Sequence, residues 1–167
     1  MAGMMEQLVE ILGEQTQRYE ELLGLSLEKR DVIVKNDVES LQKLNHLENM
    51  VISQNQKLEK RRQELVADMA IVLNEKEDNL TISRMIELME GKEEAHALTE
   101  ARDRIRSVIE ELSEVNVQNG QLVQNALEYI EYTTNLIRGS QGGTPAAYYP
   151  GTEDVDLGDS SYFDTSN

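Results

Sequence analysis

Residues 92–138 read KEEAHALTEARDRIRSVIEELSEVNVQNGQLVQNALEYIEYTTNLIR, the longest periodic pattern in the chain. Residues recur along it at seven-residue intervals in two mainly apolar tracks three positions apart, a spacing that places both tracks on one face of an α-helix. Such a helix would extend about 70 Å and needs partner helices to bury its stripe. The tracks are Leu98, Ile105, Leu112, Asn119, Ala126, Thr133 and Ala101, Val108, Val115, Leu122, Tyr129, Leu136.

A second long helix is predicted upstream. The stretch Asn36-Asp37-Val38-Glu39 has an N-cap residue with a Glu three positions later, so we expect the helix to begin near Asp37. Residues 74–79 end its pattern. This helix would be roughly 55 Å long, and it is the expected antiparallel packing partner of the helix over residues 92–138. Its apolar seam is Leu44, Val51, Leu58, Leu65 and Val72.

Two further helices complete the pattern. A first long helix is predicted from about Met4 to Lys35, and Gly24 suggests a bend or a close helix contact. A short helix capped by Thr81 should follow the second helix and end before Gly91. The expected core face of the first helix is Leu8, Leu12, Tyr19, Leu22, Ser26 and Ile33.

The predicted fold class is therefore all-α, an elongated antiparallel helical hairpin or bundle of three long helices plus one short helix. Residues 1–138 form the helical domain. Residues 139–167 hold both prolines and five of the ten glycines, carry five acids and no Lys or Arg, and are expected to be a flexible acidic tail.

Composition excludes several classes of partner and site. With 16 basic against 32 acidic side chains, the net charge is −16, which disfavours nucleic acid and anionic membrane surfaces. The longest apolar run, Met69 to Leu73, is too short to span a bilayer, and no secretory signal is visible, so a cytoplasmic location is expected. The absence of Cys excludes disulfides and Cys-ligated metals.

No catalytic or metal site is predicted. His46 and His96 are the two histidines, and the step from Glu93 to His96 is half of a carboxylate di-iron signature whose second copy is absent. There is no phosphate-binding loop and no nucleophile elbow. We therefore expect neither enzymatic activity nor a cofactor or metal ion.

The C-terminal half of the last helix carries more apolar surface than one stripe requires. Between Gln121 and Ile137 the charged residues are Glu128 and Glu131 alone. This surface is either buried between two neighbouring helices or open to a partner. Asn116 and Asn119 lie just upstream at expected core positions, where a buried Asn fixes helix register. The candidate residues are Leu122, Val123, Ala126, Leu127, Tyr129, Ile130, Leu136 and Ile137.

Several blocks in order resemble the FlgN family of flagellar export chaperones, over about residues 5–138. They are residues 22–30 (LLGLSLEKR), 33–41 (IVKNDVESL), 58–65 (LEKRRQEL), 80–82 (LTI), 116–119 (NVQN) and 127–130 (LEYI). Tyr149-Pro150-Gly151 is similar to a loose feature of many members.

The resemblance implies a non-enzymatic cytoplasmic chaperone that binds the hook-filament junction proteins FlgK and FlgL through their helical termini. It implies delivery of these clients to the flagellar type III export apparatus, with client binding toward the C-terminal part, where Tyr148 and Tyr149 could assist. A self-associating coiled-coil spacer that dimerises through the same apolar face is the alternative, and the oligomeric state stays open.

Overall fold

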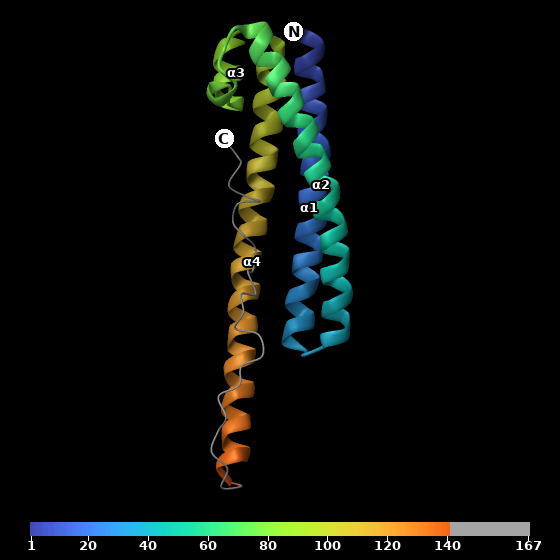
Figure 1. Cartoon of the computed structure of the whole chain (residues 1–167), viewed down its shortest axis with the longest axis vertical. Helices are drawn as coiled ribbons and strands as arrows, with labels where there is room; N and C mark the ends of the chain where they lie inside the picture. The colour runs from blue at the N-terminus through green and yellow to red at the C-terminus, as the bar shows by residue number, and fades with distance from the viewer. Residues whose placement is uncertain (141–167) are drawn as a thin grey trace.

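The computed structural model describes residues 1–140, which form an all-α fold as predicted. The elements are α1 (Ala2–Val34), α2 (Val38–Leu73), the 3₁₀ turn η1 (Glu77–Asn79), α3 (Ile82–Leu88) and α4 (Glu93–Ser140) (Figure 1). Three long helices and one short helix are therefore confirmed. The expectations for the acidic tail, including Tyr148 and Tyr149, lie outside the described residues.

The central helix of the bundle is α1. It packs along both α2 and α4, running antiparallel to α2 and parallel to α4 (Figure 1). Within residues 1–140, α2 and α4 share no comparable interface. The expected pairing of the second long helix with the third is therefore wrong. The tight turn after α1 forces α2 back along it, and the segment that includes α3 carries the chain across to the other side of α1.

The predicted core face of α1 is confirmed, because all six of its residues are buried. Near the N-terminus the core gains Met5, which joins Met69 of α2 and Met85 of α3 in one apolar cluster. Gly24 makes no close helix contact, since a Cβ added there would meet nothing within 4 Å. That part of the sequence prediction is wrong.

The apolar seam of α2 is buried at its first four positions but not at Val72, which is 54% exposed. A seven-residue repeat drifts by about 20° per heptad on a straight helix, so its fifth member has turned well away from the first. Met69 and Ala70 take its place in the core. The prediction of a continuous seam over five heptads is therefore wrong at its last position.

The turn between α1 and α2 is built by two side chains that favour turns. Asn36 has a left-handed φ of 55°, and the Asp37 N–H donates to the carbonyl of Val32, which closes α1 in a Schellman-type end. Asp37, rather than Asn36, is the N-cap of α2, because its carboxylate accepts from the Ser40 N–H. The predicted start of the helix is confirmed. The expected capping pair of Asn36 and Glu39 is wrong, because Asp37 and Ser40 form the cap instead.

The connection from α2 to α4 has the capped short helix that was predicted from Thr81 and Gly91. Thr81 caps α3 by accepting from the Arg84 N–H at 3.1 Å. Gly91 has φ +83°, a conformation that glycine adopts without steric cost. α4 then runs through Gly120 without interruption. Among residues 1–140, no helix combines the length and apolar character that a bilayer crossing requires.

Candidate partner-binding surface

The most prominent feature of the molecule is that α4 extends well past the ends of α1 and α2 (Figure 1). Asn119 of α4 contacts Ser26 of α1, and because the two helices run parallel, this 93-residue offset places Val34, the end of α1, level with roughly residue 127. α4 continues to Ser140. We call residues 127–140 the projecting segment, which has a length of about 21 Å.

The apolar face of α4 continues from the bundle onto the projecting segment. Its last fully covered residues are Leu112, Val115 and Asn119. Beyond them Leu122, Val123 and Ala126 are half-buried. On the projecting segment, Tyr129 is 70% exposed, and the other predicted site residues there, Leu127, Ile130, Leu136 and Ile137, are each more than half exposed.

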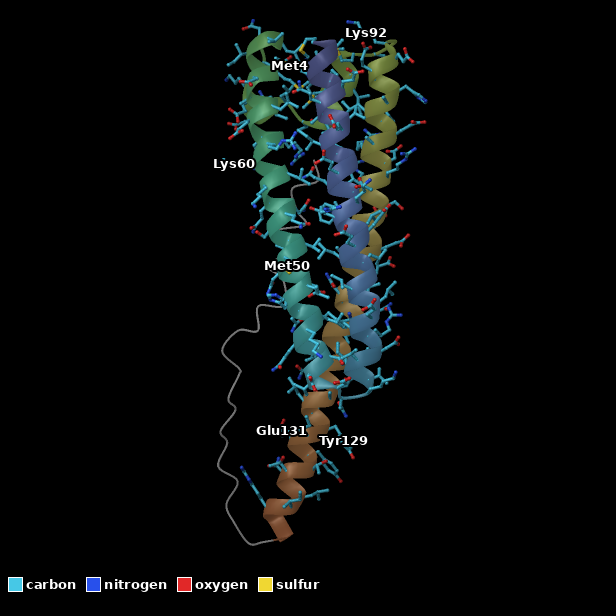
Figure 2. The ribbon with its side chains drawn as sticks, turned by 90° about the vertical axis from the view of Figure 1, so that its right-hand side faces the viewer. Met4, Met50, Lys60, Lys92, Tyr129 and Glu131 are labelled. Carbon is cyan, nitrogen blue, oxygen red and sulfur yellow. The ribbon has the colours of Figure 1, made fainter. Side chains whose placement is uncertain are left out.

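The apolar residues at the end of the bundle and on the projecting segment lie mainly along one side of the helix. At about 100° per residue, Leu122, Ala126, Tyr129, Ile130, Leu136 and Ile137 fall within a sector of roughly 120°, whereas Glu128 and Glu131 lie on the opposite side. Figure 2 shows Tyr129 and Glu131 on the segment that passes beyond the other helices. The projecting segment is thus an amphipathic helix whose apolar side is exposed to solvent.

Sequence reasoning missed one member of this surface. Tyr132 is 61% exposed and lies three residues after Tyr129 and four before Leu136, so the three side chains adjoin on the helix surface. The signal was present in the sequence as an apolar spacing of three and four. Tyr132 was nevertheless left out of the apolar set predicted between Gln121 and Ile137.

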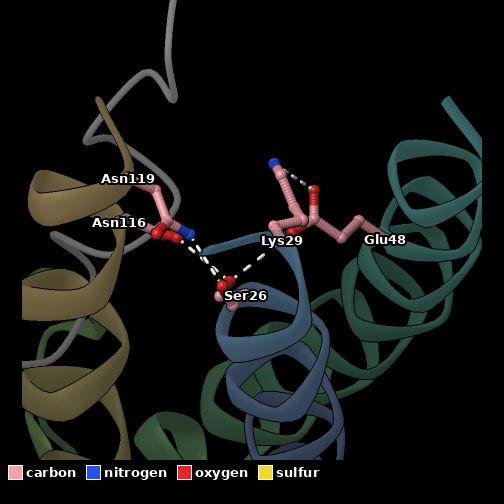
Figure 3. Close-up of polar contacts among 5 residues, drawn as sticks. All are labelled: Ser26, Lys29, Glu48, Asn116 and Asn119. Carbon is pink, nitrogen blue, oxygen red and sulfur yellow. Dashed lines mark hydrogen bonds and ion pairs between the residues drawn. The ribbon is translucent and has the colours of Figure 1, made fainter. Parts of the chain in front are cut away.

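A polar layer joins α1 to α4 on one side and to α2 on the other, just before the projecting segment begins. Asn119 Nδ2 donates to the Ser26 carbonyl at 2.7 Å, and Ser26 Oγ lies 3.1 Å from Asn116 Oδ1, to which it donates (Figure 3). On the other side of α1, Lys29 Nζ lies 3.1 Å from Glu48 Oε2 of α2. The layer therefore joins all three long helices at one level.

The two asparagines differ in their surroundings. Asn119 is only 5% exposed, as predicted, and its Oδ1 has no hydrogen-bond partner among residues 1–140. Asn116 is exposed, so its predicted core position is wrong. A buried amide with one unsatisfied oxygen costs free energy, which is consistent with a role in register rather than in stability.

The histidines show no arrangement for metal chemistry. His96 Nε2 lies 3.3 Å from Glu100 Oε1 on the same exposed face of α4. In the described part of the chain, no group of three or more His, Asp or Glu side chains is placed to hold a metal ion. The notable chemical feature of the projecting segment is its exposed apolar side chains.

Comparison with known proteins gives one family. The family model described as FlgN protein matches residues 1–152, which is most of the chain. No curated protein and no solved structure matches it.

Proposed function

We propose that this chain, which belongs to the FlgN family of flagellar export chaperones, binds the hook-filament junction proteins FlgK and FlgL. The binding surface would be the projecting segment of α4. The clients would be held by their helical termini in the cytoplasm and handed to the flagellar type III export apparatus. The observation that carries this proposal is the apolar face of α4, which α1 covers along the bundle and which continues, exposed, beyond the end of α1.

The geometry favours a helix as the bound element. Along the bundle the α4 stripe is buried by a parallel helix, α1, and the same stripe continues for about four more turns. An amphipathic client helix laid on the projecting segment would extend the line of α1 and repeat the packing seen upstream. This is recognition of a helix by an apolar surface, in which residues spaced by three and four act as anchors.

The size of the surface favours reversible binding. Full burial of one large apolar side chain contributes about 1.5–3 kcal/mol, and the projecting segment offers six exposed ones. Association and ordering of a client terminus offset much of that gain, by an estimated 4–15 kcal/mol. The net affinity is then modest, as a chaperone that must release its client requires.

The test compares two exposed apolar residues of α4. Ile130 and Val117 are 57% and 60% exposed, but they lie about 140° apart around the helix. We expect Ile130→Asp to weaken binding to purified FlgK and FlgL at least tenfold and Val117→Asp to change it less than twofold. Both variants should unfold at the wild-type urea concentration, because neither side chain is in the core.

Two results would reject the proposal. One is equal client binding by wild type and Ile130→Asp. The other is a stable wild-type dimer, measured by light scattering, that Ile130→Asp dissociates while Val117→Asp does not. That outcome would assign the projecting segment to self-association, as in a coiled-coil spacer.

A further inference from the structure

The outer face of α2 has the opposite charge to the rest of the molecule. Residues 40–63 contain five Lys or Arg and two Glu, a net charge of +3 in a chain of −16, so the remaining residues carry −19. Both acids face α1 and are paired, because Glu48 Oε2 lies 3.1 Å from Lys29 Nζ and Glu59 Oε1 lies 2.7 Å from Arg62 Nη2. The exposed charges of this stretch are therefore all positive.

These positive charges share one side of the helix. At about 100° per residue, they fall with several uncharged residues within a sector of about 100° that excludes the buried seam. We call this exposed set the basic face, and it extends about 27 Å along α2. Figure 2 shows two of its members, Met50 and Lys60, on this helix. The basic face consists of Gln42, Lys43, His46, Met50, Ser53, Lys57, Lys60 and Arg61.

Contacts within the bundle do not account for the charges at the centre of the basic face. Lys57 is three residues from Lys60 and four from Arg61, so these like charges repel one another on the helix surface. Arg61 Nη1 lies 3.7 Å from Glu14 Oε2, an exposed pair that contributes little to stability. Among residues 1–140, Lys57 and Lys60 have no ion-pair partner. An acidic partner would remove this repulsion.

The surroundings of the basic face restrict the kind of partner. A DNA duplex or an anionic membrane extends beyond 27 Å and would meet the acidic residues around the face, since the rest of the chain carries −19. An acidic helix of about 18 residues matches the face in length. Met50 is 50% exposed and Leu47 beside the face is 45% exposed, so apolar contact with a polypeptide is also available.

The basic face is separate from the projecting segment. α2 runs back along α1 from the turn after Val34, so Lys57 lies about 30 Å from that turn along the helix axis. α4 projects past the same turn in the opposite direction (Figure 1). The two surfaces therefore do not overlap, and occupation of one leaves the other free.

We propose that the basic face of α2 binds an acidic helical segment of another protein, with carboxylates beside Lys57, Lys60 and Arg61 and an apolar side chain against Met50. Charge complementarity of this kind speeds encounter and selects against basic segments. The binding weakens as salt is added, because exposed charges are screened. This second contact does not depend on client binding and stays available while the projecting segment is occupied.

The experiment measures binding of an acidic helical peptide to the full chain at low ionic strength. The probe is a fluorescent synthetic peptide of three Glu-Glu-Leu-Ala-Ala-Leu-Glu repeats, followed by fluorescence anisotropy. Lys57→Glu/Lys60→Glu/Arg61→Glu should weaken binding at least tenfold. Lys57→Gln/Lys60→Gln, which leaves the pair of Arg61 and Glu14 in place, should weaken it at least threefold.

The matched control reverses three exposed charges elsewhere in the bundle. Lys76→Glu/Lys92→Glu/Arg104→Glu changes the net charge by the same amount and should weaken binding less than threefold. Because it shares the net charge of the first triple variant, the comparison separates a local surface from the overall field of the molecule.

Four results would overturn the inference. They are no binding of the peptide by the wild type, equal weakening in the two triple variants, loss of binding in Ile130→Asp but not in the basic-face variants, and equally tight binding of phosphatidylserine–phosphatidylcholine vesicles that the basic-face variants abolish. The third would place the peptide on the projecting segment, and the fourth would make the ligand a membrane. No client is present, so none of these results bears on binding of FlgK and FlgL.

Discussion

Asn119 on α4 and Ser26 on α1 are joined by a hydrogen bond of 2.7 Å from the asparagine Nδ2 to the serine carbonyl, in the interior of the bundle. The contact joins two parallel helices at an offset of 93 residues. A shift of α4 by one heptad would move the projecting segment by about 10 Å and change which apolar side chains are exposed. We therefore expect the polar layer, if it fixes the register, to determine how much surface is exposed beyond the bundle.

Replacing Asn119 by Leu should raise stability while loosening register. The substitution removes a buried oxygen that has no partner in the described chain and adds apolar contact, so we expect a gain of about 1 kcal/mol in the free energy of unfolding. Asn125→Leu, at an exposed position of the same helix outside the polar layer, is the control and should change stability by less than about 0.5 kcal/mol.

The register effect of the same variant has its own measurement. Spin labels at Glu28 and Gln121, both exposed, would report the offset between α1 and α4. We expect one narrow distance distribution in the wild type and a broader or second distribution in Asn119→Leu. An unchanged distribution would show that apolar packing alone sets the offset.

Leucine-to-alanine substitutions along α4 should lower the free energy of unfolding strongly in the buried core and only slightly on the projecting segment. Leu98 is fully buried, so Leu98→Ala should cost about 2–5 kcal/mol because it leaves a cavity. Leu136 is 56% exposed, and Leu136→Ala should cost less than about 0.5 kcal/mol. Urea denaturation measures both. A large cost at Leu136 would mean that the projecting segment is part of the cooperative core.

The N-cap of α2 should make stability depend on pH in acid. Hydrogen bonds from the Ser40 side chain and main-chain N–H hold the pKa of Asp37 below its ordinary value. Since the folded pKa is the lower one, the contribution of Asp37 is complete above about pH 4 and is lost as pH falls through the folded pKa. Asp37→Asn keeps a capping oxygen but does not titrate.

The stability difference between wild type and Asp37→Asn, measured by urea denaturation, should therefore fall between pH 6 and pH 2. Asp37→Ala serves as the control, because it lacks both the cap and the titrating group. A constant difference between wild type and Asp37→Asn across this range would contradict the assignment.

The cap of α3 gives a similar contrast between two threonines. Thr81 Oγ1 accepts from the Arg84 N–H, so Thr81→Ala should cost about 1 kcal/mol. Thr99 Oγ1 donates instead to the Ala95 carbonyl within α4, where alanine favours the helix more. Thr99→Ala should be neutral or slightly stabilising. Equal losses in the two variants, measured by urea denaturation, would argue against the capping role.

Local features of the fold could be predicted from the sequence, because they depend on neighbouring residues. The six core residues of α1 follow from spacings of three, four and seven, and the start of α2 near Asp37 follows from local hydrogen bonding. The same local reasoning predicted a surplus of apolar side chains near Tyr129 and Ile130. It also identified Asn119 as a buried polar residue.

Only the tertiary structure decided which helices pair and where the bundle ends. An apolar stripe such as that of α4 can be buried by any helix of suitable face, so periodicity alone could not select α1 over α2 as its neighbour. The exposure of Val72 depends on the drift of a heptad around a straight helix, and that of Tyr129 on the end of α1 at Val34. These outcomes depend on contacts between residues far apart in the chain, such as Ser26 and Asn119.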